Sequence, residues 1–206
     1  MTAPHRWMGV GRLVPICGVA MGLAISAGND AGAQQEAGVD AQLAMARTAL
    51  AKYADPIVAV HDGYFSTLAC VEFLETDPRP DRMQYPVGGM GVHLFNGSLI
   101  GPNLDPARPQ VLLYEPDGDK LRLVGAEWFV PVALGVKEAP TLFGRPFDGP
   151  MEGHHPLMPQ EMHHWDLHVW LWKDNPAGMF SPTNPNLKCP TMGYSFTEEA
   201  PKLVSP

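Results

Sequence analysis

The segment GHHPLMPQEMHHWDLHVW, residues 153–170, is rich in side chains that bind metal ions or exchange protons. Five of the eight histidines of the chain lie between His154 and His168. Imidazole is a common metal ligand, and it is the side chain that titrates closest to neutral pH. The segment therefore indicates a metal site or an acid–base site, with a solvated surface loop as the alternative.

Three predicted strands each place one polar residue on an otherwise apolar face: His93, Glu127 and His168. Successive side chains of a strand point to opposite faces, so these residues are expected to point toward a buried layer. A lone buried carboxylate is costly unless it meets a cation. If the three faces converge, they form a set of two histidines and one carboxylate, which suits zinc, copper or iron.

The loop before the last predicted strand offers further ligands. We expect it to act as a lid that brings His154, His155 or His164 over the site. In an enzyme, His154 or His164 could also serve as a general acid or base. Asp166 is expected to orient a histidine rather than to bind the metal itself.

Methionines interleave with the histidines of this loop: Met151, Met158 and Met162. Thioether and imidazole together are the ligands of copper sites in oxidising compartments, so a copper-type metal is one prediction. Methionine is also a general filler of apolar gaps. The choice among zinc, copper and iron therefore stays open at this point.

Neighbouring residues are expected to shape the site. Gly91 shares a face with His93 and would leave open space beside it, as the approach of a ligand requires. Trp170 and Trp172 share the face of His168 and are predicted to line a cavity.

The elements that position these residues are N-terminal helices followed by strands. Residues 41–53 have helical periodicity, and a second helix is predicted over 57–73. Strands are predicted over 90–96, 111–115, 121–131 and 165–172. The turn PDGDK between the second and third of these is the clearest hairpin signal. This order predicts an α+β fold with a mainly antiparallel sheet of about four strands, flat or curled into a partial barrel, with long Pro/Gly-rich loops.

The N-terminus is typical of an export signal. Positive charge precedes an apolar run at 13–27, and AGA precedes Gln34, so residues 1–33 are predicted to be a cleaved signal peptide. Residues 34–40 then form a disordered leader, and 41–206 form a single domain. The location is accordingly periplasmic or extracellular, with no membrane attachment after cleavage.

Charge and cysteine content narrow the class further. The net charge is −8 without any basic cluster, which disfavours binding to nucleic acid or to anionic lipid. Outside the predicted signal peptide, only Cys70 and Cys189 remain, and in an exported protein we expect them to form a disulfide. A pair of soft metal ligands is the alternative, although their separation matches no compact cysteine motif.

Three further stretches carry a resemblance: GMGVHLFN, LDPARPQVLLYEPDGDKLRLVGAEWFVP and DLHVWLWKDNPAGMFSPTNPNLKC. Through them the chain resembles an uncharacterised family of exported bacterial proteins, over about residues 60–190. The resemblance implies a shared domain in the bacterial envelope. It brings no activity or ligand.

Three classes of function follow. The first is an exported metal-binding protein, whose partner is the metal ion alone. The second is a metal-dependent enzyme acting on a small molecule. The third is a disulfide-pinned structural or interaction domain without metal, in which Glu127 pairs with a basic residue and the histidines point apart.

Overall fold

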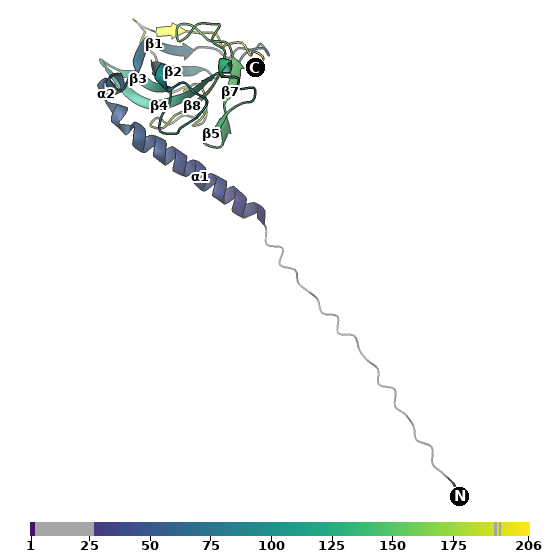
Figure 1. Cartoon of the computed structure of the whole chain (residues 1–206). Coiled ribbons are helices and arrows are strands. Elements are labelled where there is room, and N and C mark those ends of the chain that lie inside the picture. The colour runs from purple at the N-terminus through teal and green to yellow at the C-terminus, as the bar shows by residue number, and fades with distance from the viewer. Residues whose placement is uncertain (3–26, 192, 194) are drawn as a thin grey trace.

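A computed structural model describes residues 1–2, 27–191, 193 and 195–206, and it shows an α+β fold around one curled, seven-stranded sheet (Figure 1). The strand order is β7-β8-β4-β3-β2-β1-β9. The predicted signal peptide falls mostly on residues 3–26, outside the described residues. Among the described residues, no helix combines the length and the apolar character that crossing a membrane requires.

The bounds of the elements are as follows. The helices are α1 (Ala27–Leu50) and α2 (Pro56–His61), with 3-10 turns η1 (Ala51–Ala54), η2 (Gly97–Leu99) and η3 (Val132–Leu134). The strands of the large sheet are β1 (Phe65–Phe73), β2 (Gly88–Phe95), β3 (Val111–Asp117), β4 (Lys120–Pro131), β7 (Asp148–Met151), β8 (His164–Val169) and β9 (Ser195–Thr197). Strands β5 (Thr141–Leu142) and β6 (Arg145–Pro146) form a separate two-stranded sheet.

The N-terminal helix packs on the sheet through its second half. Leu43, Ala46 and Leu50 recur at helical spacing and are buried in the main core. The Arg47 side chain donates a hydrogen bond to the carbonyl oxygen of Leu171, at 3.2 Å. Residues 34–40, for which the sequence predicted a disordered leader, lie in α1, and in Figure 1 the first turns of this helix project away from the sheet.

The predicted second helix is correct only for its first turns. Asp55 caps α2 by accepting a hydrogen bond from the Ile57 amide, and Pro56 occupies the first helical position. Gly63, at φ +93°, reverses the chain directly after this helix. The following FSTLACVEF is rich in aromatic and β-branched residues, and it forms β1 instead of continuing the helix.

The predicted count of about four strands and the antiparallel description are wrong in detail. The sheet is mixed, because β1 pairs with β9 in parallel while the other neighbours are antiparallel. Strand β9 follows β8, which the sequence predicted to be the last strand, and both β7 and β9 are too short to show periodicity. The β3–β4 hairpin is confirmed, with Gly118 at φ +64° in its turn.

The curl of the sheet creates an inner face that is distinct from the main core. Leu167 and Val169 of β8 point into the core, as does Trp128 of β4. The residues that alternate with these along the two strands, including Glu127 and Phe129 of β4 and His168 of β8, point to the inner face. Beyond β9 the C-terminal chain crosses to the opposite edge of the sheet, where Leu203 bridges Met151 of β7. This crossing supports the description of a partial barrel.

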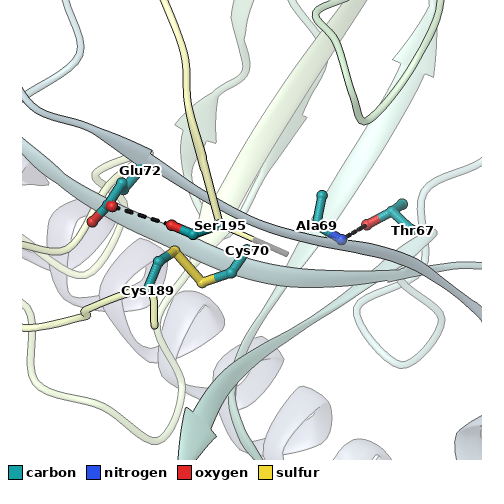
Figure 2. The surroundings of a disulfide bond; sticks show 6 residues. All are labelled: Thr67, Ala69, Cys70, Glu72, Cys189 and Ser195. Carbon is teal, nitrogen blue, oxygen red and sulfur yellow. Dashed lines mark hydrogen bonds between the residues drawn. A yellow bond between two sulfur atoms is a disulfide. The ribbon is translucent and has the colours of Figure 1, made fainter. Parts of the chain in front are cut away.

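The predicted disulfide is present and joins β1 to the C-terminal tail (Figure 2). Cys70 and Cys189 are 119 residues apart in the chain, and their Cα atoms are 5.6 Å apart. Ser195 pairs with Cys70 in the β1–β9 register and donates a hydrogen bond to Glu72. The disulfide therefore holds the tail at the point where it joins the sheet.

Candidate metal centre

Three strands bring His93, Glu127 and His168 together on the inner face of the sheet. Glu127 on β4 and His168 on β8 are direct partners across the two strands. His93 reaches the same place from β2, on the far side of β3. The Nε2 atoms of both histidines lie 3.5 Å from Oε2 of Glu127, and one ligand atom from each residue lies within 4.8 Å of the others.

The polar atoms of this cluster are buried and unpaired. Each of the three side chains is at most 5% exposed. Both ring nitrogens of His93 and both of His168 lack a hydrogen-bond partner in the described part of the chain. Buried polar groups in proteins are nearly always hydrogen-bonded, so four unpaired nitrogens at one place indicate a missing partner.

Burial sets the protonation of the cluster. It lowers the pKa of His93 to about 3, helped by the neighbouring imidazole of His168, and it lowers the pKa of His168 as well. Burial, and then the negative charge of Asp166, raise the pKa of Glu127 well above its usual value. Without an added cation, burial therefore disfavours the charged form of all three groups. The 3.5 Å contacts are not ion pairs.

The residues present fit a metal ion better than a salt bridge. Ligand atoms of a tetrahedral zinc ion, bound at roughly 2.1 Å, are about 3.4 Å apart, close to the histidine–glutamate separations here. None of the ion pairs among the described residues joins Glu127 to a lysine or an arginine. The arrangement expected for a metal-free structural domain, in which Glu127 pairs with a basic residue and the histidines point apart, is not observed.

The other two predicted ligands lie nearby but face different partners. His154 Nδ1 is 2.8 Å from a carboxylate oxygen of Glu198, and both side chains are largely buried. His164 Nε2 lies 3.6 Å from Asp166. The metal-type cluster found among the described residues holds neither histidine. Asp166 also lies 3.9 Å from Nδ1 of His168, the position from which it would orient this ring.

The loop between β7 and β8 covers the site as the predicted lid, but its histidines do not all face inward. His155 and His163 are exposed, which is the solvated arrangement. Met151 is buried in β7, where its sulfur accepts a hydrogen bond from the Tyr85 hydroxyl. Met158 and Met162 line the cavity above the cluster. His154, Met158 and Met162 of this loop therefore line the cavity, and the action of the loop as a lid stays a prediction.

The expectation that Gly91 opens space beside His93 is wrong, and so is the expectation for the two tryptophans. Gly91 has φ +89°, and a side chain there would collide with the carbonyl oxygen of Tyr114, so this glycine permits close backbone packing. Strand β8 ends at Val169, and Trp170 turns into the core, where its indole donates to the Ser181 carbonyl. Trp172 is 38% exposed and does not line the cavity over the site.

Several residues around the cluster escaped the sequence analysis. Glu198 lies in the tail, where no pattern connects it to His154. Phe65 and Thr67 line the cavity, but they belong to the part of β1 for which the sequence predicted a helix. Phe129, by contrast, is placed on the face of Glu127 by the period of two, and its ring stacks on His164 with centroids 4.7 Å apart.

No protein-family model, curated protein or solved structure matches this chain. The case for the site therefore depends on its own geometry, and the resemblance to exported bacterial proteins stays a prediction.

Proposed function

We propose that this protein is an exported metal-binding protein whose site is formed by His93, Glu127 and His168. The observation that carries the proposal is the set of four buried, unpaired imidazole nitrogens around a buried carboxylate. A cation would supply the missing partner and let Glu127 ionise. The disulfide supports export, because such bonds persist in oxidising compartments.

Zinc, copper and iron are the metals that two imidazoles and one carboxylate suit. Three protein ligands leave further coordination positions for water or another molecule, and a bound metal would supply Lewis acidity or, for copper and iron, redox chemistry. The sulfur atoms of Met158 and Met162 on the cavity wall favour copper among these. The cavity beside the cluster favours a metal-dependent enzyme as the second candidate function.

Elemental analysis of the untagged protein, purified from the periplasm, tests the proposal. We expect near-stoichiometric metal in the wild type and its loss in His93→Ala and His168→Ala. His61→Ala is the matched control, because His61 is exposed on α2 and should retain full occupancy. Circular dichroism would establish that each variant is folded.

Two results would contradict the proposal. One is a wild-type protein that holds no metal after reconstitution with zinc, copper and iron in turn. The other is metal that persists in both site variants, which would place it elsewhere in the chain.

A further inference from the structure

A cavity of about 160 Å³ lies directly over the metal-type cluster. Its floor is the inner face of the sheet, including His93, Glu127 and His168, and its roof is the loop between β7 and β8. Phe65 and Met162, which are 57% and 36% exposed, are among its lining residues, so the cavity reaches the surface.

The walls of the cavity are almost entirely apolar. They comprise Phe65, Met90, Phe95, Val111, Phe129, Leu157, Met158, Pro159 and Met162. Apart from the histidines and acids of the floor and lid, Thr67 is the single polar side chain of the lining, and its hydroxyl already donates to the backbone of His93. No lysine or arginine among the described residues lines it. A sugar or a peptide would find few hydrogen-bond partners here.

The volume of the cavity limits what can enter. An engineered protein cavity of roughly 150 Å³ with apolar walls accommodates one benzene molecule. The cavity here has about that volume, and the unpaired ring nitrogens of His93 and His168 lie at its floor. A ligand that fills it would therefore place one end against the cluster and leave the rest among aromatic and methionine side chains.

We propose that this cavity binds a small uncharged molecule, about the size of one six-membered ring, that carries a single donor atom for the metal. This inference rests on the proposed metal site, because the donor atom occupies a coordination position that His93, Glu127 and His168 leave free. The apolar walls favour a ligand with an apolar ring, and the metal favours a ligand with a donor atom.

Pyridine and benzene form a matched pair of probes, since they have nearly the same shape and differ by one donor nitrogen. The untagged protein is loaded with cobalt(II), whose visible absorption reports on coordination, and each probe is titrated by calorimetry. We expect pyridine to bind the cobalt form at least about tenfold more tightly than benzene and to shift the cobalt absorption. Metal-free protein should bind benzene at least as tightly as pyridine, because the pyridine nitrogen loses its hydrogen bond to water in an apolar cavity.

Two variants test whether the cavity itself is responsible. Met158→Trp fills the cavity from its roof and should weaken pyridine binding about tenfold or more while cobalt stays bound. Met45→Trp is the control, because Met45 is exposed on α1 outside the cavity, and it should leave both probes unaffected.

The outcomes separate this inference from the metal site. If cobalt binds stoichiometrically but pyridine and benzene bind equally, or pyridine binds unchanged to Met158→Trp, the cavity proposal is overturned and the metal site stands. If neither cobalt nor zinc, copper or iron binds, both proposals fail together, and benzene binding at least as tightly as pyridine would then describe an apolar pocket without a metal.

Discussion

His93 and His168 bury four ring nitrogens that have no partner among the described residues, and an unsatisfied buried polar group costs roughly 1–3 kcal/mol. Beside them lies Glu127, which no lysine or arginine among the described residues pairs with. At the residue scale, the cluster therefore destabilises the metal-free protein. Such a cost is retained where function requires it.

Replacing Glu127 with methionine should stabilise the metal-free protein by about 1–3 kcal/mol and abolish metal binding, because it removes a buried carboxyl and keeps the side-chain volume. Urea unfolding in the presence of a chelator measures the first effect. Glu115→Met is the matched control. Glu115 is also buried, at 7% exposed against 3% for Glu127, but it pairs with Arg122 and Lys173, so its loss should lower stability. A loss of stability in both variants would mean that Glu127 has a structural role.

Asp148 gives the protein a measurable pH dependence. Burial, and then the negative charge of Asp166, raise the pKa of Asp148 to about 6. The fold thus favours the protonated form, so this group's contribution to stability is full below about pH 4 and is lost as the pH rises through 6. Asp148→Asn should remove this fall and raise the unfolding free energy at pH 7 by about 1–2 kcal/mol, since Asp148 is partly exposed.

Urea unfolding of metal-free protein between pH 4 and pH 7.5 checks this expectation. Asp119→Asn, in the exposed β3–β4 turn, is the control and should keep the wild-type pH dependence. An unchanged slope in Asp148→Asn would assign the pH dependence to other groups.

At the scale of elements, the disulfide fixes to the sheet the C-terminal tail that contacts the lid. Cys70 and Cys189 hold β9 beside β1, and the chain that leaves β9 carries Glu198, which contacts His154 of the lid. The tail then bridges the edge of β7. The disulfide therefore helps to hold in place the C-terminal tail, whose Glu198 contacts the lid over the site.

Removing both cysteines, as Cys70→Ala with Cys189→Ala, should lower the unfolding free energy by about 4–5 kcal/mol in the chain-entropy model. It should also increase amide hydrogen exchange in the lid. Glu198→Gln is the comparison, because it weakens the contact with His154 but leaves the disulfide intact. We expect it to loosen the lid with little loss of global stability, and equal losses in both proteins would contradict this separation.

At the scale of the whole molecule, the site exists only where distant segments meet. His93, Glu127 and His168 stand on strands that the order β8-β4-β3-β2 places across four positions of one sheet. Helix α1 covers the opposite face, and the lid covers the inner one. Curling of the sheet brings β2 and β8 close enough for both histidines to reach the same carboxylate.

The sequence by itself determined that His93, Glu127 and His168 face inward, because the period of two assigns residues to faces within a strand. The same rule failed for Trp170, because β8 ends at Val169. The sequence also determined the β3–β4 turn, through Gly118, and the disulfide, through the number of cysteines. It misassigned β1, since the residues after Gly63 begin a strand that only pairing with β2 and β9 stabilises.

Only the tertiary structure decided that the three inward residues share one point, that Glu198 reaches His154, and that the cavity has apolar walls. Sheet order, curl and the path of the tail depend on contacts between residues far apart in the chain. Local periodicity carries no information about those contacts, because each strand satisfies it equally well beside any neighbour.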